Sequence, residues 1–344
     1  MNKNDIFESM EKDVINSNIS EEQKSSLLKN IMKLREQQIN IMITGATGCG
    51  KSSTINALFQ TEVAKVGTGA GPETMEISRY ELDNLILWDS PGLGDGVEAD
   101  RRHAGNIIRK LAEKDPHGNA LIDLVLVILD GSTKDLGTSY ELINQVIIPN
   151  LGEEKEKRIL VAVNQADAAM KGRYWDYENN EPMEPLRRYL EEKVASVRER
   201  IREGTGVDVE PIYYSAGYKE EGLPQTKPYN LSKLLYYMVC ATPKEKRMIY
   251  VDHTNEDPEM WKHDDRLSDY VEETRKSLWE SIVETAGRWG SAWGDAGSVL
   301  GETGRKVFSG LGKLAGGLAE VGKAILPHVF LPRRRGPFGP ISWF

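Results

Sequence analysis

The most constraining feature of the sequence is the run Gly45-Ala-Thr-Gly-Cys-Gly-Lys-Ser52, which has the pattern G-x-x-x-x-G-K-[ST]. It follows the apolar stretch 39–43 and precedes the helix-forming segment 53–60. Glycines let successive backbone N–H groups turn toward phosphate oxygens, and the start of the next helix adds positive potential. Lys51 would reach the β- and γ-phosphates, and the Ser52 hydroxyl would hold Mg²⁺. The sequence therefore predicts a nucleoside-triphosphate site; a plain glycine-rich turn is the alternative.

A second chemical landmark is Asp89-Ser-Pro-Gly92, which follows the apolar stretch 85–88. Residues 75–82 and 85–88 predict a hairpin that turns at Asp83-Asn84. A carboxylate at a strand end holds Mg²⁺ through water, and a following glycine offers its N–H to a γ-phosphate. D-x-P-G alone also occurs in ordinary turns. Its position after a phosphate loop predicts the metal side of the same site.

The segment 66–75 between these motifs is rich in glycine and contains Thr68 and Thr74. A loop of this kind places a threonine hydroxyl on Mg²⁺ when the γ-phosphate is present and releases it afterwards. We predict Thr74 because it directly precedes the next strand. An ordinary connecting loop is the alternative.

Two further buried strands, 121–130 and 158–164, flank a predicted helix at 135–149, and the second strand ends in Asn164-Gln-Ala-Asp167. Asp167 can accept hydrogen bonds from N1 and N2 of guanine, a pair of donors that adenine lacks. An unpaired carboxylate would penalise ATP, so the motif predicts guanine specificity. A sixth strand, 209–217, carries Ser215-Ala216, whose backbone would contact the guanine O6.

The order of these motifs resembles the translation-factor-related GTPases, most closely the bacterial Era-like branch with its YfjP/YeeP type, over residues 20–243. The phosphate-loop region is also similar to septin-like and chloroplast-import GTPases. The resemblance implies an α/β P-loop GTPase (Ras-like) fold, a six-stranded, mostly parallel sheet with helices on both faces. It also implies GTP or GDP with Mg²⁺ as ligands, and a GTPase activity.

The resemblance assigns site residues in three groups. The phosphates would contact Gly45, Gly48, Gly50, Lys51, Ser52 and Ser53, and the base would contact Asn164, Gln165, Asp167, Ser215 and Ala216. Mg²⁺ would be held by Ser52, Thr74 and Asp89, and hydrolysis would depend on Lys51, Thr74 and Gly92.

Three departures from the family pattern modify this expectation. Gln165 replaces the usual lysine and covers the base less well. Leu93 stands where some relatives carry a water-orienting glutamine, which predicts slow intrinsic hydrolysis unless a partner supplies the missing group. Gly48 replaces the asparagine of potassium-activated relatives, which disfavours K⁺. Arg101 and Arg102 could act as a hydrolytic finger in cis, but solvated helix charges are the preferred interpretation.

Composition limits the other function classes. The formal charge of −9 disfavours a nucleic-acid surface. We expect a cytoplasmic protein, because the sequence has two scattered cysteines, no apparent secretion signal and no apolar run long enough to span a membrane. Peripheral association with the inner membrane is an option. Cys49 in the phosphate loop raises the idea of a thiol with a lowered pKa, against simple tolerance of a small residue. Five histidines without ligand spacing disfavour zinc.

We divide the chain into an N-terminal helical extension (1–37), a GTPase domain (38–243), a linker (244–264) and a C-terminal helical module (265–344) that begins with a helix over 265–286. Ser20 opens a capping box, followed by an apolar stripe of Leu27, Leu28, Ile31, Met32 and Leu34.

The C-terminal module contains three seven-residue units, in which glycines recur every three or four residues from 287 to 304. Each glycine costs about 1 kcal/mol relative to alanine in a helix, so either close contact with another helix or a bilayer offsets the loss, or the segment is not helical when free. Residues 287–344 would lie on a membrane surface through an amphipathic helix and a basic, aromatic tail. Packing within the chain or in a homo-oligomer, and a flexible tail, are the alternatives.

These patterns predict a GTP-dependent switch in which water attacks the γ-phosphate, assisted by an activating protein or a second copy of the chain. A scaffold that holds GTP without turnover is one alternative, motivated by Leu93. Association with the ribosome or RNA is another, and the acidic balance disfavours it.

Overall fold

The computed structural model describes residues 6–59, 77–218 and 226–287. Its main sheet has six strands in the order β2-β3-β1-β4-β5-β8. Strand β2 pairs antiparallel with β3, and the other pairings are parallel. The strands are β1 (Ile39–Thr44), β2 (Ser78–Leu82), β3 (Leu85–Asp89), β4 (Leu124–Asp130), β5 (Ile159–Asn164) and β8 (Ile212–Tyr213). The six-stranded, mostly parallel α/β fold expected from the sequence is confirmed.

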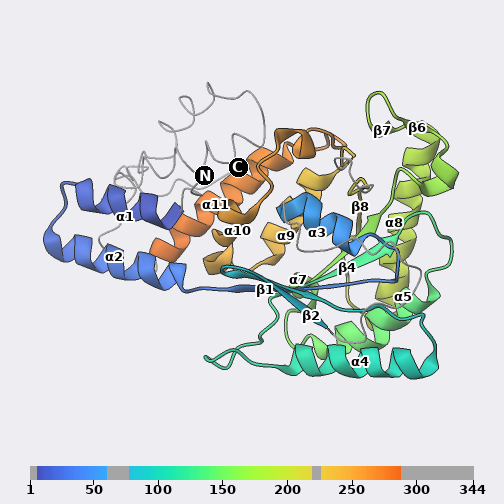
Figure 1. Ribbon diagram of the computed structural model, residues 1–344, viewed down its shortest axis with the longest axis horizontal. Helices are drawn as coiled ribbons and strands as arrows, with labels where there is room; N and C mark the ends of the chain where they lie inside the picture. Colours follow the sequence, from blue (N-terminus) through green and yellow to red (C-terminus); the bar gives the residue numbers. More distant parts are fainter. Residues whose placement is uncertain (1–5, 60–76, 219–225, 288–344) are drawn as a thin grey trace, which may run out of the picture.

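Helices cover both faces of this sheet (Figure 1). One face packs against α1 (Ile6–Asn16), α2 (Glu21–Arg35), α3 (Lys51–Phe59), α9 (Leu231–Ala241), α10 (Ile249–His253) and α11 (Tyr270–Gly287). The other packs against α4 (Val97–Ala112), η1 (Leu142–Ile147) and α8 (Glu184–Thr205). Alternation along β1 explains the division, since Ile41 and Ile43 face the first set and Met42 faces the second.

Further, shorter elements lie between residues 137 and 182. They are α5 (Gly137–Glu141), α6 (Ile148–Asn150), α7 (Lys155–Arg158), η2 (Ala169–Gly172), and the small hairpin of β6 (Trp175–Asp176) and β7 (Glu181–Pro182). The helix predicted at 135–149 is built from α5, the π-helical segment η1 and α6. The predicted hairpin is also present, and Asp83 at its turn has φ +50°.

The N-terminal extension forms two helices, and the capping box opens the second. Gln23 N donates to Ser20 Oγ over 3.2 Å, and Ser20 N donates to Gln23 Oε1 over 3.0 Å. Ile31 and Leu34 are buried, but Met32 is 58% exposed, so its inclusion in the apolar stripe is wrong. At 100° per residue Met32 turns away from the face that the others share.

Residues 244–264, expected to be a linker, are folded against the core. They contain η3 (Lys244–Lys246), α10 and η4 (Pro258–Trp261), and they bury Tyr250 and Trp261. Asn255 also caps α3, because its backbone N donates to Leu58 O over 2.8 Å and its Nδ2 to Ala57 O over 3.0 Å. The polar, proline-marked composition concealed these apolar anchors, which is why the sequence suggested a linker. The other domain boundaries remain a proposal.

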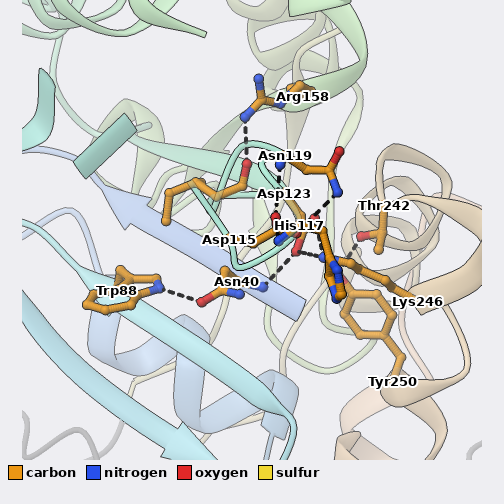
Figure 2. Close-up of polar contacts among 11 residues, drawn as sticks. Asn40, Trp88, Asp115, His117, Asn119, Asp123, Arg158, Thr242, Lys246 and Tyr250 are labelled. Carbon is orange, nitrogen blue, oxygen red and sulfur yellow. Dashed lines mark hydrogen bonds and ion pairs between the residues drawn. The ribbon is translucent and has the colours of Figure 1, made fainter. Parts of the chain in front are cut away.

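An ion pair fastens this segment to the sheet at the amino ends of β1 and β4 (Figure 2). Lys246 Nζ lies 2.7 and 2.9 Å from the two carboxylate oxygens of Asp123. Asn40 N donates to Asp123 Oδ2 over 2.9 Å, and Trp88 Nε1 donates to Asn40 Oδ1 over 3.0 Å. The carboxylate and the ammonium are both largely withdrawn from solvent. This cluster lies at the opposite edge of the sheet from the phosphate loop.

The helix predicted at 265–286 corresponds to α11, which packs along α9. Leu278 and Tyr270 are buried, so α11 is part of the same core as the nucleotide-binding motifs. The glycine-rich units beyond Gly287 lie outside the described residues. Within 6–59, 77–218 and 226–287, none of the helices has the length and apolarity needed to cross a membrane.

Candidate functional site

The phosphate-loop motif lies between the end of β1 and the start of α3, as its spacing requires. Gly50 has φ +91°, and a Cβ there would lie 2.2 Å from Asn164 Nδ2. Only glycine satisfies both conditions. Lys51 Nζ donates to Gly45 O over 2.9 Å, which holds the ammonium against the loop.

Two residues of the Asn164-Gln-Ala-Asp167 motif also contact this loop. Asn164 Nδ2 donates to Cys49 O over 2.8 Å, and Gln165 Nε2 donates to Gly48 O over 2.6 Å. The backbone of Gln165 is in the left-handed region, with φ +59°. The glutamine that replaces the family lysine therefore still connects the two motifs.

The end of β8 completes the same corner. Ala216 N donates to Asn164 Oδ1 over 2.9 Å, and Ser215 Oγ donates to Asp167 Oδ1 over 2.6 Å. Asn164 is buried and its amide serves both neighbours at once. The phosphate loop, the Asp167 loop and the Ser215 loop thus form one hydrogen-bonded unit at the carboxyl edge of the sheet.

The Asp89-Ser-Pro-Gly92 segment approaches the phosphate loop from β3. A Cβ on Gly92 would lie 2.4 Å from Gly45 O and 2.8 Å from Ala46 N, so no side chain fits. Asp89 is half-buried, and within the described residues its Oδ1 has no hydrogen-bond partner. Burial raises the pKa of Asp89, while the Lys51 charge acts in the opposite direction.

This arrangement fits a divalent cation. A buried carboxylate oxygen without a partner is costly unless a cation or donor satisfies it. Ser52, in the first turn of α3, supplies the hydroxyl that the phosphate-loop motif assigns to Mg²⁺. Thr74, the third expected ligand, lies outside the described residues, as does Thr68. Ser53 lies beside Ser52 in the same turn.

The side chains considered from the sequence as aids to hydrolysis are either apolar or exposed on α4. Leu93 is half-buried and packs against the core on the α4 side of the sheet. Arg101 and Arg102 are exposed on α4. An apolar side chain cannot orient water, so Leu93 offers no replacement for the glutamine found in some relatives.

Cys49 does not have the lowered pKa considered from the sequence. Its side chain is fully buried, and burial raises the pKa of the thiol to about 11 despite the nearby Lys51. Desolvation outweighs the positive potential of the loop. The redox-switch idea is therefore wrong, and Cys49 serves as a small packing residue.

Sequence reasoning missed two residues beside the site. His103 on α4 is buried, and its Nδ1 lies 3.1 Å from Gly92 O. Lys193 on α8 donates to Gly131 O over 2.8 Å and so binds the chain just after β4. A signal existed for His103, because it shares the buried face of α4 with Ile107 and Leu111. Nothing in the local sequence distinguishes the half-buried Lys193 from the exposed lysines of other helices.

The fold and these loops define the class of the protein: the chain carries a P-loop GTPase domain. Residues 40–165 match the family described as 50S ribosome-binding GTPase. The resemblance to the YfjP type stated from the sequence is confirmed at this level.

Individual relatives are similar to this chain over part of its length. The uncharacterized proteins YkfA and YfjP of Escherichia coli K12 are 31% and 30% identical over 147 residues, which is 42% of this chain and 47% of each relative. The chain thus spans about half the length of these relatives. Protein MJ0920 of Methanocaldococcus jannaschii is 25% identical over 205 residues, 56% of this chain and 94% of that protein.

Solved structures with a similar chain path include Toc33 from Arabidopsis thaliana and the LeoA bacterial dynamin GTPase from ETEC. Toc33 has a TM-score of 0.39 at 18% identity, covering 59% of this chain and 82% of its own. LeoA has a TM-score of 0.39 at 14% identity, covering 88% of this chain and 44% of its own.

Proposed function

We propose that this chain binds GTP with Mg²⁺, hydrolyses it slowly, and acts as a nucleotide-dependent switch. The observation that carries the proposal is the position of Asn164, which hydrogen-bonds to the phosphate loop through Cys49 and to the Ser215 loop through Ala216. One buried side chain thereby sets the distance between the predicted phosphate and base subsites. A nucleotide would bind with its phosphates in one subsite and its base in the other, at this fixed distance.

The chain's own groups would act on the triphosphate in distinct ways. Lys51 would exchange its bond with Gly45 O for the β- and γ-phosphates. Gly92 would donate its N–H to the γ-phosphate, which its close approach to Gly45 permits. Ser52, Asp89 and Thr74 would hold Mg²⁺. The metal neutralises charge that develops on the phosphate oxygens.

Guanine recognition would depend on Asp167. Its carboxylate would accept from N1 and N2 of guanine, while Ser215 Oγ keeps it oriented at 2.6 Å. Adenine offers neither donor and would leave the carboxylate unpaired, which supports a strong preference for GTP and GDP over ATP.

Slow turnover follows from Leu93. Because this side chain packs against the core, we propose that an activating protein or a second copy of the chain supplies the group that orients water. The same observation supports a second candidate, a GTP-bound scaffold without turnover. Single-turnover phosphate release, with and without cell extract, separates them, because a scaffold releases none in either condition.

The specificity test is Asp167→Asn. An amide accepts from N1 but presents N–H to the guanine N2 amino group, so GTP affinity should fall at least 100-fold, whereas xanthosine triphosphate, with an oxygen at that position, should bind better. Calorimetry of the full chain and the variant with GTP, ATP and xanthosine triphosphate measures both changes. Equal affinity of the native chain for GTP and ATP would refute the proposal.

We further propose that residues 287–344 contact a membrane surface or a protein partner in a nucleotide-dependent way, with a cytoplasmic and peripheral location. Support comes from the sequence: the glycines that recur every three or four residues from 287 to 304, the amphipathic pattern and the basic, aromatic tail.

A further inference from the structure

Lys193 on α8 is half-buried, and its ammonium group contacts the loop that follows β4. Its Nζ donates to Gly131 O over 2.8 Å, to Asp130 O over 3.4 Å and to Thr133 O. An ammonium has three donors and no acceptor, so the three backbone carbonyls use its full donor capacity. Burial lowers the pKa of Lys193, while the charge of Asp130 acts in the opposite direction. The ammonium group thus gathers three carbonyls of residues 130–133 around one point.

The loop 130–133 is also closed from within by a side chain. Asp130 Oδ1 accepts from Ser132 N and from Ser132 Oγ, each over 2.7 Å. These bonds give the loop a fixed shape, and Lys193 attaches that shape to α8.

On its other side, the loop lies against the chain that leads to Asp167. Gly131 N donates to Asn164 O over 2.7 Å, which continues the pairing of β4 with β5 beyond the ends of both strands. A Cβ on Gly131 would lie 2.4 Å from Asn164 O and 3.3 Å from Gln165 O, so the two backbones are in contact. The peptide groups after Asn164 and Gln165 therefore cannot turn without moving Gly131.

The turn that carries Asp167 is supported from both neighbouring strands. On the β8 side, Ala166 N donates to Tyr214 O over 3.1 Å. On the β4 side, the support comes from Gly131, and Lys193 holds Gly131 in place. A half-buried lysine on α8 is thereby connected, through one loop, to the turn that is expected to read the base.

We propose that Lys193 is a positioning residue for base recognition, because it holds Gly131 against the Asn164–Gln165 backbone and so keeps the carboxylate of Asp167 aimed at the base. This inference rests on the proposed function. Guanine offers two donors, at N1 and N2, and a carboxylate accepts from both only when it is correctly oriented. Hypoxanthine has no 2-amino group and offers N1 alone. Loss of orientation therefore costs guanine more than hypoxanthine.

Affinities of the full chain for GDP and inosine diphosphate, both with Mg²⁺, provide the readout. Lys193→Met keeps an unbranched side chain and removes the charge and the donors, whereas Lys193→Arg keeps both. We expect Lys193→Met to reduce the preference for GDP over inosine diphosphate about fivefold, part of the worth of one hydrogen bond to a charged group. Lys193→Arg should retain most of the preference.

Arg188→Met is the matched control, because Arg188 is exposed on the same helix, and its substitution should leave the preference unchanged. An equal loss for both nucleotides in Lys193→Met, with a lower melting temperature, would mean that Lys193 only supports the fold. That result, or an unchanged preference in Lys193→Met, would overturn the proposal.

Hydrogen exchange on the native full chain gives a second test that does not depend on a variant folding. GDP should slow exchange in residues 130–133 and in 164–167 together, and inosine diphosphate should slow both segments less. Slowing confined to 164–167 would overturn the coupling and leave the proposed function intact. If the native chain binds neither nucleotide, the proposed function fails and this inference fails with it.

Discussion

At the scale of single residues, burial determines chemistry more strongly than neighbours in the sequence do. Gly45, Gly50 and Gly92 were identifiable from the motifs, and a Cβ at each would clash with neighbouring atoms, whereas Gly48 has open space around it and is set apart by its φ of +82°. The environments of Cys49 and His103 were not identifiable, because they depend on residues that the fold brings from other elements.

The thiol of Cys49 should therefore be unreactive in the folded protein. A pKa of about 11 leaves only about one thiolate in a thousand at pH 8, and the sulfur is also inaccessible. Iodoacetamide followed by intact-mass measurement should add one label quickly, at the exposed Cys240, and a second only after unfolding in urea.

Cys240→Ser provides the control, since it should remove the fast label and leave the slow one. Two fast labels on the native chain would show that the phosphate loop opens readily.

At the scale of elements, the sequence predicted the strands and the order of the motifs because apolar runs and turn residues are local signals. It could not predict that 244–264 packs on the core, because that packing depends on contacts with β1, β4 and α3. Lys246 and Asp123 are 123 positions apart, and no local pattern connects them. The same limit applies to the π-helical segment within the predicted helix 135–149.

Lys246→Met should destabilise the fold by about 3 kcal/mol at pH 8, because it leaves the carboxylate of Asp123 buried without its cation. Burial already raises the pKa of Asp123, and loss of the lysine raises it further. When a carboxyl group has a higher pKa in the folded than in the unfolded state, it contributes stability at low pH. This contribution is lost as the pH rises through the folded-state pKa. The deficit should thus be smaller at pH 5 than at pH 8.

Urea unfolding at the two pH values measures this deficit. Arg198→Met is the matched control, because it breaks the exposed Arg198–Asp208 pair and should change stability little at either pH. A deficit that grows toward acid would contradict the assignment of Asp123.

At the scale of the whole molecule, α11 packs in the same core as the site motifs, so the helix over 270–287 is not separate from the rest of the fold. Leu278 and Tyr270 are buried against that core. The surface role proposed for residues 287–344 is best tested with a truncation that leaves α11 in place.

A 1–287 chain should keep the melting temperature and the GTP affinity of the full chain but lose sedimentation with anionic vesicles. A 1–264 chain should melt several degrees lower, because it exposes the apolar surface that α11 covers. Vesicle binding by 1–287 equal to that of the full chain, or none by either, would refute the membrane proposal.

The pairing of Asp123 with Lys246 also has a consequence during biosynthesis. The carboxylate emerges from the ribosome 123 residues before its ammonium partner, a delay of about 6–25 s at ordinary translation rates. Throughout that interval the Asp123 carboxylate lacks its ammonium partner. The GTPase domain therefore reaches its final stability only after Lys246, which follows the last of the site motifs, has been translated.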